Sequence, residues 1–244
     1  MKYARLDCPA DVIEFSSDGA FIAIGYQNGQ VTVLDSASFA IKSVRRDRKK
    51  AVSEIKFNPP TTILAVGAHD QFIFLYNIEK GFKPMRKLKG HSSTILHIDF
   101  NDEGDVLKSV CQAYEILFFS VRQSRNIGSG ASDYKDERWF TNTSRIGWHQ
   151  QGIWPPCADG SDINTCDRSP TGNVFATGDD FGHVKLFRYP CPVDNANFIK
   201  YAGHSEHLTK VRFHHQVNYL ISTGGADKAI FQWKYQADDL EEDE

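Results

Sequence analysis

The chain has 244 residues, of which 41% are hydrophobic and 24% charged, and its formal net charge is −3. This composition predicts a folded protein with a sizeable core, and it excludes both a disordered chain and a protein that coats nucleic acid by bulk positive charge. No apolar run approaches the roughly 18 residues of a membrane span, the first residues lack the apolar centre of a secretory signal, and the cysteines form no C-x-x-C pair. We therefore expect a cytoplasmic protein with reduced thiols, no nucleic-acid or membrane partner, and no cofactor.

A pattern of short strands and turns occurs five times along the chain. Each copy contains an apolar strand, a turn, a small-residue strand with Gly, a second tight turn and an alternating strand that ends in a bulky apolar residue. The end of the first strand recurs every 42 to 45 residues or so, with one longer step of about 68, at Phe15, Phe57, Phe100, Arg168 and Phe213. This period predicts an all-β fold of four-stranded antiparallel β-propeller blades with almost no helix.

The one long step reflects extra residues at 121–161. We expect this segment to supply the outer strand of the third blade and then a packed excursion that carries Trp148 and Trp154, because large aromatic side chains in a β-repeat usually bury apolar area. The sequence thus predicts a partial propeller of about five blades over residues 1–236. An acidic tail follows at 237–244, with too few apolar residues to pack.

Two Gly-His dipeptides, Gly90-His91 and Gly203-His204, stand at the same distance before the anchors of the third and final copies. These features resemble WD40 repeats. In the final copy the structural hydrogen-bond set of that family falls on His204, Thr223, Asp227 and Trp233. Its physical role is to satisfy buried polar groups between strands. In the third copy Ala113 and Phe119 stand at the Asp and Trp positions, so we expect packing, and not the full network, to hold that blade.

Further segments narrow the resemblance. The long step contains Gly152-Ile153-Trp154-Pro155 and Asp159-Gly160-Ser161-Asp162-Ile163-Asn164, and Thr177-Gly178-Asp179-Asp180-Phe181-Gly182 follows in the next strands. This arrangement resembles the C-terminal propeller of the echinoderm microtubule-associated protein-like (EMAP-like) family, continuously from about residue 90 to Lys234. The resemblance implies a scaffold of the cytoplasm and cytoskeleton that organises microtubules and binds proteins, tubulin and microtubules among them.

Propellers of that family have seven blades, whereas about five are present here, so the chain resembles a fragment of one propeller. The alternatives are a closed five-bladed ring and a propeller whose missing blades come from another chain or are absent. An unclosed propeller would expose sheet faces that neighbouring blades normally cover.

Catalytic motifs do not occur in the sequence. There is no P-loop, no H-E-x-x-H and no G-x-S-x-G, and the nine histidines follow the repeat. We interpret His204, His207, His214 and His215 as structural or turn residues and expect no metal site. The sequence therefore predicts a non-enzymatic protein-binding scaffold. The alternative is a generic WD40 adaptor or scaffold subunit of a multiprotein complex unrelated to microtubules.

Two basic segments lie at equivalent places one blade apart. The candidate partner-binding residues are Arg45, Arg46, Arg48, Lys49 and Lys50 in the first segment, and Lys83, Arg86, Lys87 and Lys89 in the second. Because each segment includes an outer strand and the loop that follows it, we expect one contiguous positive patch that is complementary to an acidic partner. The alternative is ordinary solvated charge on outer strands.

Overall fold

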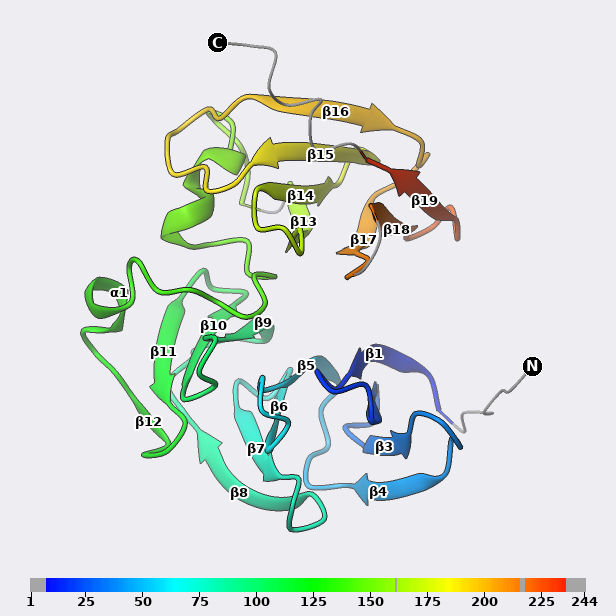
Figure 1. The fold of residues 1–244 in the computed structure, drawn as a ribbon, viewed down its shortest axis with the longest axis vertical. Helices are drawn as coiled ribbons and strands as arrows, with labels where there is room; N and C mark the ends of the chain where they lie inside the picture. Colours follow the sequence, from blue (N-terminus) through cyan, green and yellow to red (C-terminus); the bar gives the residue numbers. More distant parts are fainter. Residues whose placement is uncertain (1–7, 161, 216–217, 236–244) are drawn as a thin grey trace. The chain divides into compact units, whose positions relative to one another are not determined.

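The structure is a computed structural model that describes residues 8–160, 162–215 and 218–235. The chain forms two compact units, Met1–Phe140 and Thr141–Glu244. Three antiparallel sheets belong to the first unit and two to the second (Figure 1). These five sheets correspond to the five copies of the repeat, so the predicted all-β architecture of propeller-type blades is confirmed.

Each sheet of the first unit has four strands, which follow one another in chain order from one edge to the other. The first sheet contains β1 (Ala10–Phe15), β2 (Phe21–Tyr26), β3 (Val31–Asp35) and β4 (Ile41–Arg45). The second contains β5 (Val52–Phe57), β6 (Ile63–Ala68), β7 (Ile73–Asn77) and β8 (Lys83–Leu88). The third contains β9 (Ile95–Phe100), β10 (Val106–Cys111), β11 (Ile116–Ser120) and β12 (Arg125–Asn126).

The second unit has one sheet of four strands and one of three. The four-stranded sheet contains β13 (Ile163–Arg168), β14 (Val174–Asp179), β15 (His183–Arg188) and β16 (Phe198–Ala202). The final sheet contains β17 (Leu208–Phe213), β18 (Tyr219–Gly224) and β19 (Ile230–Lys234). Among residues 8–160, 162–215 and 218–235 this last sheet has three strands, and the fourth, outer strand predicted for the blade would follow Lys234, beyond the end of the described residues at Tyr235. The predicted acidic tail at 237–244 lies outside the described residues.

Helix is confined to two short segments of the described chain, α1 (Gly130–Asp133) and the 3-10 segment η1 (Trp148–Ile153). In chain order both follow β12 and precede β13, in the region predicted as an excursion. The near absence of helix is therefore confirmed over the described residues. None of the helices described has the length and apolar character needed to cross a membrane.

Glycines at the second turn of two blades are required by close backbone approach. Gly29 and Gly182 have φ values of 85° and 79°, a conformation that L side chains rarely adopt. A Cβ on Gly29 would lie 2.7 Å from the carbonyl oxygen of Arg48, and one on Gly182 would lie 2.5 Å from that of His204. In both blades the turn thus packs against the segment that leads into the next sheet.

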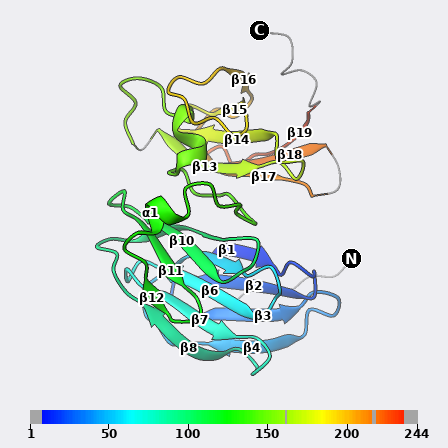
Figure 2. The same ribbon diagram turned by 60° about the vertical axis from the view of Figure 1, so that its left-hand side comes forward.

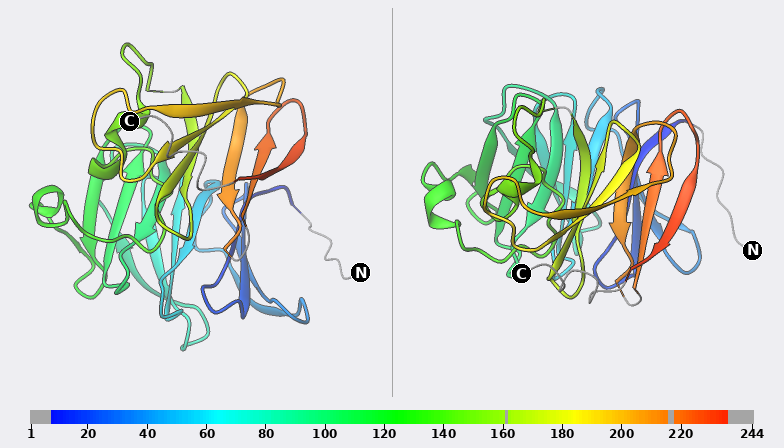
Figure 3. Two further views of the ribbon diagram at one scale, coloured as in Figure 1. Left: turned by 45° about the horizontal axis from the view of Figure 1, so that its top comes forward. Right: turned by 90° about the horizontal axis from the view of Figure 1, so that it is seen from above.

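Sheets within the first unit pack face to face, with β5 between β1 and β9 (Figure 1), and the outer strands β4, β8 and β12 follow one another in the same order (Figure 2). The anchors Phe57 and Phe100 are 4% and 1% exposed, whereas Phe15, at the same repeat position of the first sheet, is 59% exposed. In the second unit β13 lies beside β17 (Figure 3). A repeat position that is core in the second and third sheets is thus solvent-accessible in the first.

The long segment between the third and fourth copies begins, as predicted, with the outer strand of the third sheet. Strand β12 completes the third sheet by pairing with β11. The indole of Trp139 is buried, 5.9 Å from the ring of Phe118. Trp154 is half-buried and its Nε1 donates to the carbonyl oxygen of Arg145 at 3.2 Å, whereas Trp148 is exposed. Packing in this segment therefore rests on Trp139 and Trp154, and the expected burial of Trp148 is wrong.

Candidate functional site

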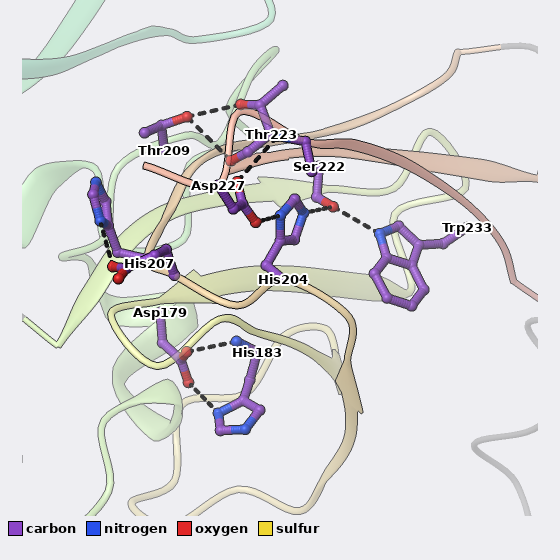
Figure 4. Close-up of polar contacts among 11 residues, drawn as sticks. Asp179, His183, His204, His207, Thr209, Ser222, Thr223, Asp227 and Trp233 are labelled. Carbon is purple, nitrogen blue, oxygen red and sulfur yellow. Dashed lines mark hydrogen bonds and ion pairs between the residues drawn. The ribbon is translucent and has the colours of Figure 1, made fainter. Parts of the chain in front are cut away.

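A buried polar chain holds the final sheet together. His204 lies between two partners, with its Nδ1 2.8 Å from a carboxylate oxygen of Asp227 and its Nε2 2.8 Å from the hydroxyl of Ser222 (Figure 4). The indole Nε1 of Trp233 donates to the same hydroxyl at 2.8 Å. In one tautomer every atom is satisfied: Nδ1–H donates to Asp227, the Ser222 hydroxyl donates to Nε2, and Trp233 donates to Ser222.

Ser222, and not the predicted Thr223, completes this chain. The Thr223 hydroxyl lies 2.8 Å from that of Thr209, at an exposed position away from His204 (Figure 4). Neighbouring residues of a strand point to opposite faces, so an error of one residue moves the hydroxyl to the wrong side of the sheet. The pKa of the Asp227 carboxyl is lowered, first by the backbone N–H of Ala229 and also by His204, against the opposing effect of burial.

The third sheet contains a second version of this network, which the sequence analysis missed. The Nε2 of His91 lies 2.7 Å from the hydroxyl of Ser109, and both residues are buried. Ala113 stands at the aspartate position, and the carboxylate of this network comes instead from Glu115, which accepts hydrogen bonds from the backbone and the hydroxyl of Ser92, each at 2.8 Å. Its Oε2 lies 3.5 Å from Nδ1 of His91. The serine stands 18 residues after the histidine in both blades, and this shared spacing was the signal that could have revealed it.

One side chain explains why the carboxylate comes from a different position in the third sheet. Cys111 lies two residues after Ser109, where the final sheet has Gly224. A Cβ on Gly224 would lie 1.8 Å from Oδ1 of Asp227, so a cysteine there excludes an aspartate placed as in the final blade. Glu115 meets the histidine from further along the chain, and the thiol of Cys111 donates to its Oε2 at 3.2 Å.

The two predicted basic segments meet in the first unit. The Nη2 of Arg45, at the end of β4, donates to the carbonyl oxygen of Gly81 in the turn that precedes β8, at 2.9 Å. The Nζ of Lys87 on β8 lies 5.6 Å from the ring centre of Phe74, and the guanidinium of Arg48 lies 4.3 Å from the same ring. Arg48 from the first basic segment and Lys87 from the second therefore approach the same aromatic ring.

Accessibility divides the predicted residues into two groups. Arg48 is only 6% exposed, its Nη2 donates to the carbonyl oxygen of Phe72 at 3.4 Å, and burial lowers the pKa of its guanidinium while Asp70 opposes that shift. Arg45 is half-buried, and Arg46 is exposed but donates to Gln30 at 2.9 Å. The exposed remainder, called the basic rim here, consists of Lys49, Lys50, Lys83, Arg86, Lys87 and Lys89.

The structure contains five antiparallel sheets, and within each sheet the strands follow one another in chain order. In two of the sheets a histidine, a serine and a carboxylate form a hydrogen-bonded set. These features define a WD40-type β-propeller protein. The family model for the second β-propeller of echinoderm microtubule-associated protein matches residues 1–235. The chain belongs to this family.

Curated relatives agree with this assignment. Echinoderm microtubule-associated protein-like 4 of Xenopus tropicalis is 40% identical over 232 residues, which cover 94% of this chain and 25% of the relative. The human protein of the same name is 39% identical over 238 residues, covering 96% of this chain and 24% of the relative. The 77 kDa echinoderm microtubule-associated protein of Lytechinus variegatus is 37% identical over 222 residues, covering 90% of this chain and 33% of the relative. The chain thus spans between about a quarter and a third of the length of these relatives.

Proposed function

We propose that this chain is a non-enzymatic protein-binding module of the microtubule cytoskeleton, located in the cytoplasm, and that it contacts the acidic surface of tubulin through the basic rim. The relatives are microtubule-associated by name, which supports the choice of partner. The observation that supports the choice of surface is the contact between the two basic segments: Arg45 at the end of β4 donates to Gly81 in the turn before β8, and Arg48 and Lys87 both approach the ring of Phe74, in an otherwise mildly acidic chain.

Electrostatic complementarity of this kind acts over a limited range. The screening length is about 8 Å at physiological ionic strength and about 3 Å at 1 M salt, so a contact between charged surfaces speeds and orients association mainly at low salt. The proposal therefore predicts binding to microtubules that weakens steeply as salt is added.

Co-sedimentation with polymerised tubulin tests this at several salt concentrations. The variant combines Lys49→Glu, Lys50→Glu and Arg86→Glu, and the matched control combines Lys200→Glu, Lys228→Glu and Lys234→Glu, which are exposed residues of the second unit. Both triple variants change the net charge equally, so any difference between them reports position and not total charge. We expect the rim variant to lose most binding at low salt and the control to keep most of it.

The outcomes separate the two functions considered. Equal loss in both variants would reduce the effect to net charge and remove the basic rim as a specific surface. Absence of sedimentation for the unmodified chain at low salt would overturn the microtubule proposal and favour the generic adaptor.

A further inference from the structure

Three side chains with different metal-ligand chemistry converge at the third sheet. A nitrogen of His91, the sulfur of Cys111 and a carboxylate oxygen of Glu115 all lie within 4.8 Å of one another. They come from the segment before β9, from the end of β10 and from the turn before β11. His91 and Cys111 are buried, whereas Glu115 is partly exposed.

The histidine in this cluster differs from its counterpart in the final sheet. The Nδ1 of His204 makes a 2.8 Å hydrogen bond to Asp227, whereas the Nδ1 of His91 is buried and has no hydrogen-bond partner. A buried nitrogen without a partner is costly, and its place in a native structure calls for an explanation. The Nδ1 of His91 lies 3.5 Å from Oε2 of Glu115, so the network leaves this nitrogen less well satisfied in the third sheet than in the final one.

We propose that His91, Cys111 and Glu115 form a binding site for a divalent transition-metal ion of the zinc class. Zinc takes cysteine sulfur at about 2.3 Å and histidine nitrogen or carboxylate oxygen at about 2.0 to 2.2 Å, so a tetrahedral site holds its ligand atoms about 3.3 to 3.6 Å apart. The Nδ1 of His91 lies 3.5 Å from Oε2 of Glu115, and the sulfur of Cys111 lies 3.2 Å from the same oxygen. Two edges of the tetrahedron are thus already near their metal-bound lengths.

The residue at the tryptophan position permits the histidine tautomer that such a site requires. In the final sheet Trp233 donates to the serine hydroxyl, but Phe119 at the equivalent place has no donor. The hydroxyl of Ser109 is then available to accept Nε2–H of His91, which leaves the Nδ1 lone pair directed to the cluster. Metal-bound histidines usually donate their other ring N–H in this way, because that contact orients the ring.

The donor set of the cluster suits a divalent ion, because it combines an imidazole nitrogen with a thiol and a carboxyl group. Binding releases one proton from the thiol of Cys111 to solvent, after which the thiolate and carboxylate together balance the charge of the ion. The 37% exposure of the Glu115 side chain provides access for the ion and for a water as fourth ligand.

Cobalt(II) is a suitable probe because thiolate ligation produces a charge-transfer band that histidine and carboxylate ligands alone do not. We expect one equivalent of cobalt to give this band with the 244-residue chain, and zinc to displace it. Cys111→Ser should abolish the band, whereas Cys157→Ser, at an exposed cysteine, should keep it. Glu115→Gln should weaken affinity at least tenfold, as should His91→Gln.

Because His91 and Cys111 are buried, their substitution could also impair folding, so folding of each variant is measured separately. Circular dichroism identifies any variant that fails to fold, and Glu115→Gln changes a partly exposed side chain, so its effect on affinity remains interpretable. Retention of the band in Cys111→Ser, no band in the unmodified chain, or unchanged affinity in Glu115→Gln would each overturn the proposal. In the second case the cluster would be a hydrogen-bond network of the blade alone.

Discussion

Ser222→Ala removes the hydroxyl that links His204 to Trp233 in the final sheet. Ser222 is fully buried, and the two nitrogens that it contacts each lie 2.8 Å away. A buried polar group that loses its partner costs about 1 to 3 kcal/mol. His204 is buried and bears the full cost, whereas Trp233 is half-buried, so water replaces part of its lost bond. We expect a loss of unfolding free energy of about 2 to 4 kcal/mol.

Urea unfolding followed by tryptophan fluorescence measures this loss. For a slope of about 3 kcal/mol per molar urea, the midpoint should fall by about 1 M. Thr223→Val is the matched control, because it removes the neighbouring hydroxyl from an exposed pair with Thr209 and should cost less than about 1 kcal/mol. Equal midpoint shifts in the two variants would refute the assignment of Ser222 to the buried chain.

Two further predictions concern the first unit. A Cβ on Gly25 would lie 2.5 Å from a methyl group of Val52, so Gly25→Ala should cost about 1 to 3 kcal/mol of unfolding free energy by overpacking two sheets. Gly128→Ala is the control, because a Cβ there meets no atom within 4 Å. Similar urea midpoints for the two variants would contradict this prediction. The folded-state pKa of Glu115 is about 2 against an ordinary 4.5, so its contribution to stability is present above pH 4.5 and is lost as the pH falls toward 2. Glu115→Gln should therefore reduce the loss of unfolding free energy between pH 4.5 and 2, whereas the control Glu103→Gln should not. Identical curves of unfolding free energy against pH for the two variants would rule out this contribution of Glu115.

The repeat alone was enough to predict the sheets. Alternating apolar residues, Gly at turns that need a positive φ, and a period near that of a propeller blade are local properties, and each acts through backbone geometry within a few residues. The order of strands in each sheet follows from these short connections. The resemblance to the EMAP-like family could also be recognised from the sequence, because the residues that carry it belong to the same repeated blades.

Side-chain partners depended on the tertiary structure. Thr223 and Ser222 are adjacent in sequence and differ only in the face to which they point, and composition alone does not distinguish them. In the third sheet Glu115 supplies the carboxylate that Asp227 supplies in the final sheet, although it lies two positions after the equivalent residue, Ala113. Cys111 occupies the space that the final sheet leaves open at Gly224. The exchange of one carboxylate position for another can be seen only when the end of β10 and the start of β11 are placed side by side.

Burial of charge was also decided by packing. Arg48 and Lys49 are neighbours in one basic run, yet Arg48 is buried against the ring of Phe74 and Lys49 is exposed. Likewise, Phe15 and Phe57 have the same repeat position, and only the second has a sheet over it. The sequence by itself determined which residues form strands, because strand formation is local. Which side chains are covered depends on the neighbouring sheet, because burial is a property of contacts between elements distant in the chain.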